Sequence, residues 1–278
     1  MSQSSINVRR RFVDGPFGQV HLREAGEPSD PKTGKPPLLC LHQSPKSSRE
    51  FLKIMPFLAQ DRYVVAVDSP GHGESDLPGS EADATIMTYA RSAWAAVDAL
   101  GMLDSGNKVD LLGHHTGAKV ATEMAWQRPD DVGTIVMVSA LVLTDAEVDA
   151  FKDMFEEIPL DEAGTRFSEG WAKAVQHRGP GVSLVDLAAS FAENFRAGEA
   201  YEWGHKAAFN YNAYFPDRVA TLDQRIVVLN PKDMLYELTP RVAPLLKNGV
   251  VQDQADWGFG FMDSDSENAA QTIREALS

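Results

Sequence analysis

The chain has 278 residues, of which 43% are hydrophobic and 24% are charged. This length can enclose one large hydrophobic core, alone or with a smaller insertion, and it excludes a peptide-sized module. The chain carries 40 acidic and 26 basic side chains, so its formal net charge is −14. A charge of this sign should repel nucleic acid and anionic membrane surfaces, and we expect neither as a partner.

The N-terminal residues MSQSSINVRRRF lack the apolar segment of a secretory signal, and no window of the sequence has the length and hydrophobicity of a membrane span. We therefore expect a cytoplasmic protein. The only cysteine is Cys40, so no disulfide can form within the chain. Its apolar surroundings, PPLLCLH, favour a buried thiol without a catalytic role.

Short β-rich segments alternate with helical patterns along the chain, which is typical of a mostly parallel sheet covered by helices. The first two segments predict an antiparallel hairpin around Gly15-Pro16. Later segments such as YVVAV, TIVMV and RIVVL have the continuous apolar character of buried parallel strands. The expected strands are residues 10–13, 19–24, 38–41, 63–67, 109–112, 134–138, 226–229 and 250–252.

Helical spacing predicts helices over residues 84–101, 116–128 and about 267–277. The tetrapeptide Ser47-Ser48-Arg49-Glu50 has the pattern of a capping box, followed by a helix that Pro56 should kink or end. From residue 141 to residue 216 the strand signals vanish and four helical patterns follow. We therefore expect a helical cap (lid) over residues 141–216 and a core domain formed by residues 1–140 and 217–278.

Polar loops follow four of the expected strands. In open α/β sheets, ligands bind beyond the carboxyl ends of the strands, so these loops are the candidate binding segments. They are His42-Gln43-Ser44-Pro45, the octapeptide DSPGHGES at residues 68–75, Gly113-His114-His115-Thr116-Gly117, and Asn230-Pro231-Lys232-Asp233.

Together these loops resemble those of the α/β-hydrolase superfamily, in particular its lidded branch of haloalkane dehalogenases, epoxide hydrolases and C–C bond hydrolases. The first loop matches the oxyanion loop His-Gly-x-Pro, with Gln43 in place of glycine, and the second matches Asp-x-x-Gly-x-Gly-x-Ser. The third matches the nucleophile elbow Gly-x-Ser-x-Gly, with His115 in the serine position. The resemblance spans nearly the whole chain and implies an α/β fold with a mostly parallel, eight-stranded sheet flanked by helices and a helical lid.

Two departures from the family pattern concern proton transfer. By the resemblance, a catalytic histidine should follow the eighth strand, but this chain has Trp257 or Phe259 at the expected place. The acid of the triad should follow the seventh strand, where Asp233 lies. A serine triad therefore cannot be assembled in the usual way. Because an imidazole reaches farther than a serine hydroxyl, we expect His115 to hydrogen-bond Asp233 and form a catalytic dyad.

In this dyad His115 is a general base or a nucleophile, and we favour the base. Asp233 fixes the tautomer of the imidazole. The resemblance further implies an oxyanion hole formed by the amides of Ser44 and Thr116. Aromatic residues of the lid and of the segment after the eighth strand predict a pocket for a small apolar substrate. The other expected pocket residues are Gln43, His42, His114, Trp257 and Phe259.

Several alternatives stay open at this point. Ester or lactone hydrolysis, C–C bond cleavage, and proton transfer in a lyase or isomerase all suit such a site, and so does a non-catalytic protein that only binds a small molecule. No cofactor is implied. We expect no metal site built from His42, His72 and His115, because no carboxylate or cysteine recurs at ligand spacing. The oligomeric state is left open, a homodimer included.

Overall fold

A computed structural model describes residues 6–27, 34–154 and 158–278. Its centre is an eight-stranded sheet with the order β1-β2-β4-β3-β5-β6-β7-β8. β1 and β2 form an antiparallel hairpin, β2 is antiparallel to β4, and the other neighbouring strands are parallel. All eight strands lie where the sequence predicts them: β1 (Arg9–Gly15), β2 (Gly18–Ala25), β3 (Leu38–Leu41), β4 (Val64–Val67), β5 (Val109–His114), β6 (Val132–Val138), β7 (Ile226–Pro231) and β8 (Gly249–Gln254).

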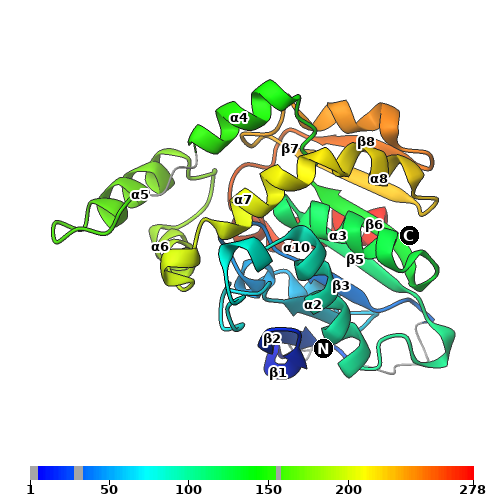
Figure 1. Cartoon of the computed structure of the whole chain (residues 1–278). Coiled ribbons are helices and arrows are strands. Elements are labelled where there is room, and N and C mark those ends of the chain that lie inside the picture. Colours follow the sequence, from blue (N-terminus) through cyan, green and yellow to red (C-terminus); the bar gives the residue numbers. More distant parts are fainter. Residues whose placement is uncertain (1–5, 28–33, 155–157) are drawn as a thin grey trace.

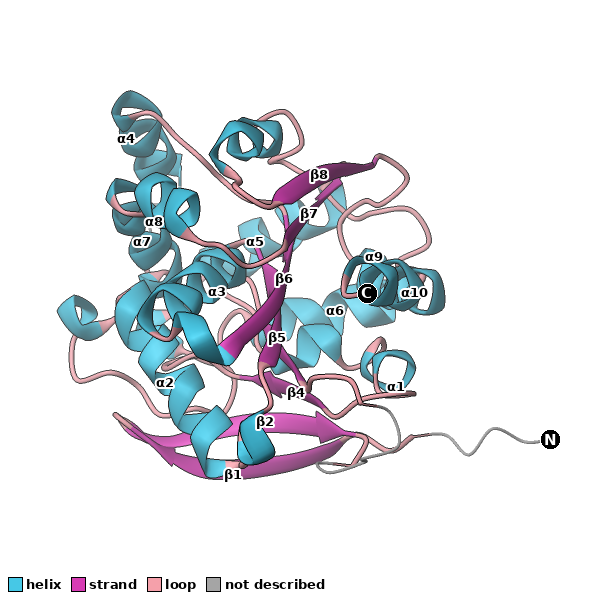
Figure 2. Ribbon diagram, turned by 90° about the vertical axis from the view of Figure 1, so that its right-hand side faces the viewer, coloured by secondary structure: helices cyan, strands magenta, loops and turns pink. Residues whose placement is uncertain are grey.

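Helices cover both faces of the sheet, which is seen nearly edge-on in Figure 2. This three-layer arrangement buries the parallel strands on both sides, as their apolar sequences predict. One face is covered by α2 (Ile86–Ala99), α3 (Thr116–Gln127) and α8 (Phe215–Thr221), and the other by α1 (Met55–Leu58), α9 (Phe261–Ser264) and α10 (Ser266–Ala276).

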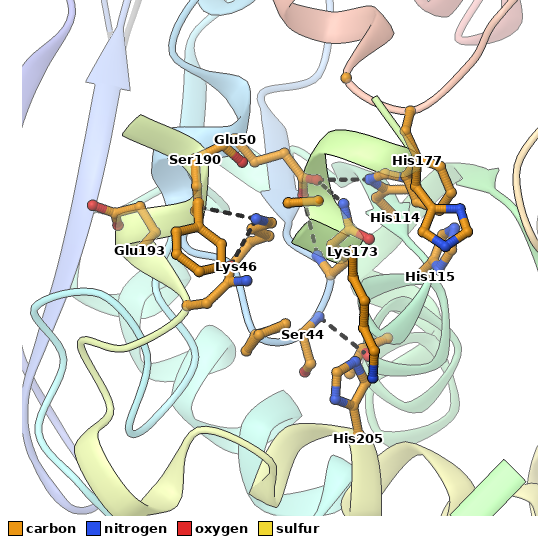
Figure 3. Close-up of a pocket in the computed structure, with 18 of the residues that line it drawn as sticks. Ser44, Lys46, Glu50, His114, His115, Lys173, His177, Ser190, Glu193 and His205 are labelled. Carbon is orange, nitrogen blue, oxygen red and sulfur yellow. Dashed lines mark hydrogen bonds and ion pairs between the residues drawn. The ribbon is translucent and has the colours of Figure 1, made fainter. Parts of the chain in front are cut away.

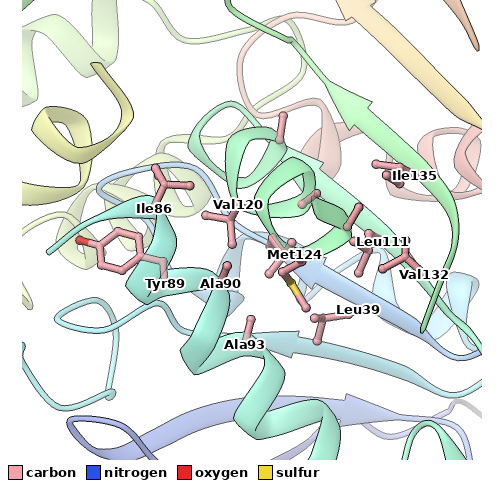
Figure 4. Close-up of a cluster of buried hydrophobic side chains, with 14 of the residues drawn as sticks. Leu39, Ile86, Tyr89, Ala90, Ala93, Leu111, Val120, Met124, Val132 and Ile135 are labelled. Carbon is pink, nitrogen blue, oxygen red and sulfur yellow. The ribbon is translucent and has the colours of Figure 1, made fainter. Parts of the chain in front are cut away.

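The strands divide their side chains between two hydrophobic clusters, one on each face. Leu39 and Leu111 pack with Val120 and Met124 of α3 in the cluster shown in Figure 4. The adjacent residue Cys40 belongs to the cluster on the opposite face, because neighbouring residues of a strand point to opposite sides. Burial raises the pKa of the Cys40 thiol, which agrees with the expectation of an inert cysteine.

The segment between β6 and β7 is helical. Its described part contains no strand, and α8, at its end, is preceded by α4 (Asp145–Met154), α5 (Thr165–Gln176), α6 (Leu184–Glu193) and α7 (Trp203–Asn210). Figure 1 shows α5 and α6 on the side of the molecule away from β8. The ammonium group of Lys46 donates hydrogen bonds to the Ser190 carbonyl (2.9 Å) and to Asn194 (2.7 Å). These bonds attach α6 and the residue that follows it to the loop after β3.

The expected capping box forms only in part, and the structure corrects this expectation. Ser47 caps a short 3-10 helix, η1 (Ser48–Phe51), by accepting a hydrogen bond from the Arg49 amide. Glu50 bonds instead to Gln43 and to His114. A long-range partner has therefore replaced the local one, and the chain continues through a turn into the four-residue α1 with Pro56 in its first turn.

The turn between β5 and α3 brings two backbones into direct contact. A Cβ at Gly117 would lie 1.9 Å from the Leu41 carbonyl oxygen, and a Cβ at Gly113 would lie 2.3 Å from the Gly117 carbonyl oxygen. His115 at the tip has φ 49° and ψ −108°, an unusual conformation for a residue with a side chain. The two glycines therefore permit the tight turn, and the turn lifts His115 above the N-terminus of α3.

Gly117→Ala should lower the free energy of unfolding by about 3 kcal/mol, because the backbone of β3 cannot move away from the added methyl group without disturbing the sheet. Urea denaturation measures the change. Gly79→Ala is the matched control: its Cβ would approach only Asp83, at 3.6 Å, and its effect should stay within ~0.5 kcal/mol. Equal effects of the two substitutions would contradict this account of the turn.

Lys119 of α3 is a second unusual feature, because it is a fully buried lysine. Its ammonium group donates a hydrogen bond to the Ala208 carbonyl (2.8 Å) and lies 5.5 Å from the centre of the Phe215 ring. Burial lowers the pKa of Lys119 from 10.5 to about 7. The folded chain therefore loses this proton at a lower pH than the unfolded chain does.

Lys119→Met should stabilise the protein by about 2 kcal/mol at pH 6, where the buried ammonium of the wild type is charged in both states. Between pH 7 and pH 10.5 the unfolded wild type binds more protons than the folded form, so wild-type stability rises with pH. The advantage of the variant should consequently shrink toward pH 10. Denaturation curves at several pH values measure the difference in unfolding free energy between the variant and the wild type. A difference that does not change with pH would contradict this prediction.

Candidate active site

His115 and Asp233 meet above the carboxyl ends of the strands. Nε2 of His115, at the tip of the elbow between β5 and α3, lies 2.8 Å from Oδ2 of Asp233, which follows β7. The Ser139 hydroxyl donates to the same carboxylate oxygen (2.6 Å), and the Leu235 amide donates to Oδ1 (2.7 Å). The side chains of His115 and Asp233 are 13% and 3% exposed. The contact is thus largely shielded from solvent.

The electrostatics of this pair determine the tautomer of the imidazole. Burial alone would raise the pKa of Asp233, but its hydrogen bond and attraction to His115 outweigh this effect and lower the pKa to about 2. Burial lowers the pKa of His115, and Asp233 offsets the shift only in part. At neutral pH the ionised carboxylate therefore accepts a hydrogen bond from the Nε2–H group of a neutral ring, and Nδ1 keeps its lone pair.

The backbone around Ser44 and Thr116 offers hydrogen-bond donors at one side of His115. Thr116 is the first residue of α3, so its amide has no partner within the helix. The Ser44 amide lies 3.4 Å from the Thr116 hydroxyl, a long contact that a better acceptor can replace. The Ser44-Pro45 peptide bond is cis. Ser44 and Thr116 both line the cavity.

Glu50 is a largely buried acid, with its side chain 10% exposed, that the sequence pattern did not identify as part of the site. Its carboxylate accepts hydrogen bonds from the backbone and side chain of Gln43 and lies 2.9 Å from Nδ1 of His114. Burial would raise the pKa of Glu50, but the contacts with His114 and Gln43 lower it to about 2. Figure 3 shows this carboxylate beside His114. In the sequence, Glu50 fits a helix-capping motif, and its actual partner His114 lies 64 positions away. The local pattern therefore did not indicate the contact with His114.

A cavity of about 620 Å³ opens over these groups. His114, His115 and Thr116 line it at the elbow, and residues of the helical segment after β6 line it as well. Figure 3 shows Lys46, His177 and His205 around the same space. Apolar side chains of the wall come from the helical segment after β6 and from the segment after β8, and they include Leu141, Phe151, Leu187, Phe191, Phe209 and Phe261.

The structure places the other predicted pocket residues in two environments. Gln43, Ser44, His114 and Phe259 line the cavity. Trp257 does not line it, contrary to our expectation: it is 6% exposed and stacks on Phe261 with the ring centres 4.3 Å apart. The apolar sequence after β8 is compatible with either Trp257 or Phe259 in the core. In the structure Trp257 packs in the hydrophobic core and Phe259 lines the cavity.

His42 is also directed away from the cavity. Its Nε2 accepts a hydrogen bond from the Ser69 amide (2.9 Å), and its Nδ1 donates to the Gln43 carbonyl (2.8 Å). The buried His72 lies beside it, with ring centres 5.3 Å apart. Both imidazoles thus join the loops after β3 and β4. They do not form a group with His115 that could bind a metal ion.

The loop after β4 has a structural role. Asp68 accepts hydrogen bonds from the His21 ring (2.7 Å) and from the Ser48 amide (2.7 Å), and Ser75 donates to the Asp68 carbonyl (2.8 Å). A Cβ at Gly73 would lie 2.0 Å from the Asp68 carboxylate. The spacing Asp-x-x-Gly-x-Gly-x-Ser therefore describes a loop folded around its own carboxylate, which fixes the neighbouring oxyanion loop.

Three known proteins illustrate what the chain is similar to. An uncharacterised protein of Mycobacterium tuberculosis is 35% identical over 105 residues, which cover 38% of this chain and 29% of that protein. A proline iminopeptidase of Heyndrickxia coagulans is 28% identical over 174 residues, covering 59% of this chain and 58% of that protein. The chain thus spans less than two thirds of either relative. The crystal structure of the epoxide hydrolase VrEH1 from Vigna radiata matches with a TM-score of 0.73 at 20% identity, over 99% of this chain and 98% of that one.

None of the helices in the described residues is long and apolar enough to cross a membrane. Residues 36–210 match the family defined by the alpha/beta hydrolase fold. This stretch includes the oxyanion loop, the elbow and most of the helical segment after β6. Together with the eight-stranded sheet, the match shows that the chain belongs to the α/β-hydrolase fold family.

Proposed function

We propose that this protein hydrolyses small carbonyl compounds, esters or lactones in particular, with His115 as a general base. The observation that carries the proposal is the 2.8 Å contact between His115 Nε2 and Asp233 Oδ2 at the tip of the elbow. An ionised Asp233 holds the proton on Nε2, so that Nδ1 accepts a proton from a water molecule. The iminopeptidase and epoxide hydrolase named above agree with a hydrolytic reaction in general.

The proposed reaction proceeds through a tetrahedral intermediate. Water loses a proton to Nδ1 of His115 while its oxygen attacks the substrate carbonyl carbon. The amides of Ser44 and Thr116 stabilise the resulting oxyanion. The bond to the leaving group then breaks, and the imidazolium returns its proton to the departing oxygen. Asp233 stays ionised throughout and stabilises the positive charge on the ring.

The proposed substrate is small and largely apolar. A volume of about 620 Å³ is in the range of small-molecule pockets, and much of its wall is aromatic or aliphatic. We further propose that residues 141–216 form a cap on a core domain of residues 1–140 and 217–278. Hydrogen bonds from Lys46 and Ser47 to residues 190–194 support this division, because they join two separate parts across the cavity.

His115→Gln should lower kcat/KM for hydrolysis of para-nitrophenyl esters by at least ~100-fold, because the amide side chain cannot accept the proton of water. His115→Ser restores the family's usual elbow residue and should be equally inactive, because no imidazole follows β8 to activate the hydroxyl. Thermal unfolding confirms that each variant is folded. Full turnover by folded His115→Gln would refute the proposal.

Pre-steady-state kinetics of the wild type separate the two possible roles of His115. A general base releases the leaving group at a constant rate from the first turnover. A nucleophile forms an acyl-imidazole and gives an initial burst when deacylation is slow. We expect no burst. Substrates that bind tightly but are recovered unchanged would instead favour a protein that only binds small molecules.

Asp233→Asn should lower kcat by ~100-fold or more with little change in KM, because an amide does not hold the proton on Nε2. Ser139→Ala removes one hydrogen bond to the same carboxylate and should cost less than ~10-fold. Asp223→Asn is the matched control at a side chain that is 88% exposed and paired with Lys247. An equal loss in Asp223→Asn and Asp233→Asn would contradict the role given to Asp233.

A further inference from the structure

We propose that His114, His115 and Asp233 form a binding site for one divalent transition-metal ion, with Zn²⁺ as the preferred biological ion. One potential ligand atom from each residue lies within 4.8 Å of the other two. Two imidazoles and one carboxylate are a common ligand set for zinc. The three residues come from the end of β5, the elbow tip and the loop after β7. Because Asp233 is distant from the two histidines in sequence, the site does not correspond to a short sequence motif.

The first two ligand atoms are already adjacent. Nε2 of His115 and Oδ2 of Asp233 are 2.8 Å apart, with a proton between them. A zinc ion in place of this proton would bond to both atoms at about 2.0 to 2.2 Å. The neutral ring of His115 then carries its proton on Nδ1. Metal binding therefore changes the tautomer of His115 and does not change the number of protons on it.

His114 supplies the third ligand through its other ring nitrogen. Its Nδ1 faces Glu50 at 2.9 Å, so Nε2 is the nitrogen left for a metal ion. The rings of His114 and His115 are nearly perpendicular, with their centres 4.6 Å apart. The potential ligand atoms of the three residues lie within 4.8 Å of one another, so metal binding requires them to draw closer together. Because both histidines line the cavity, water could occupy a fourth position.

The contacts around the three ligands are those of an outer coordination sphere. Metal-binding histidines usually donate their second ring proton to a carboxylate, which orients the ring and makes it a stronger ligand. Glu50 meets this requirement for His114, and Ser139 donates a hydrogen bond to the Asp233 carboxylate. Both acids are ionised at neutral pH, so two buried negative charges lie close to the site. A dication would be attracted to this position.

The site would also affect catalysis, an effect that rests on the proposed function. With the metal ion on Nε2, the proton on Nδ1 prevents His115 from acting as a base. Zinc should therefore inhibit ester hydrolysis, and a chelator should reverse the inhibition. Metal binding itself does not depend on any activity, so the two proposals can fail separately.

Titration of metal-free protein without an affinity tag tests the site. Co²⁺ should bind with one ion per chain and give the visible absorption of a tetrahedral nitrogen and oxygen site, and Zn²⁺ should displace it. Mg²⁺ should not displace Co²⁺, because Mg²⁺ prefers six oxygen ligands. Calorimetry gives the dissociation constant for Zn²⁺. Absence of a visible Co²⁺ band, or displacement by Mg²⁺, would overturn the proposal.

Variants identify the ligands. His114→Gln and Asp233→Asn should each weaken Zn²⁺ binding by ~100-fold or more, and Glu50→Gln should weaken it by ~10-fold through its effect on His114. His205→Gln is the matched control, because His205 also lines the cavity and contacts a carboxylate, that of Glu202. Its dissociation constant should stay within ~2-fold of the wild-type value. Binding that survives His114→Gln, or that His205→Gln weakens equally, would refute the assignment. The Glu50 variant keeps the test decisive if His114→Gln fails to fold.

Discussion

The close approach of α3 to β3 is the constraint on which the site depends. At Gly117 the space beside the Leu41 carbonyl is too small for a methyl group, so the helix begins directly against the strand. This contact forces the sharp turn that displays residue 115 beside the first residues of α3. The tip residue and the amide of Thr116, which we propose as an oxyanion donor, are therefore positioned by backbone packing and not by their own side chains.

A turn fixed in this way accepts different residues at its tip. The unusual φ of 49° at His115 belongs to a tight turn that the flanking glycines permit, and the His115 amide donates a hydrogen bond to the Val138 carbonyl. The side chain is consequently free to differ from the serine that the family pattern would lead one to expect. What the tip residue does depends on the groups that its side chain reaches, which here are Asp233 and the cavity.

The sequence predicts the sheet and the pairing of His115 with Asp233 because both follow from regular rules. A hairpin pattern predicts the first two strands and short β-rich segments predict the others, and parallel strands bring the residues after β5 and β7 to the same edge. Glu50 escaped prediction because its local pattern matched a helix cap while its partners are distant in sequence. Trp257 was wrongly expected to line the cavity because periodicity does not reveal which of several neighbouring aromatic rings enters the core.

The absence of a histidine after β8 and the presence of one at the elbow are structurally connected. Of the two residues at the place where the family pattern leads one to expect an imidazole, Phe259 lines the cavity. Trp257 stacks on Phe261 at an interplanar angle of 10° and belongs to the hydrophobic cluster of α1 and α10. A histidine in place of Trp257 would have to displace packed aromatic surface before it could approach Asp233. Oδ2 of that carboxylate is in any case already bonded to His115 and Ser139. In the proposed mechanism, proton transfer takes place at the elbow, while Trp257 of the segment after β8 belongs to the hydrophobic core.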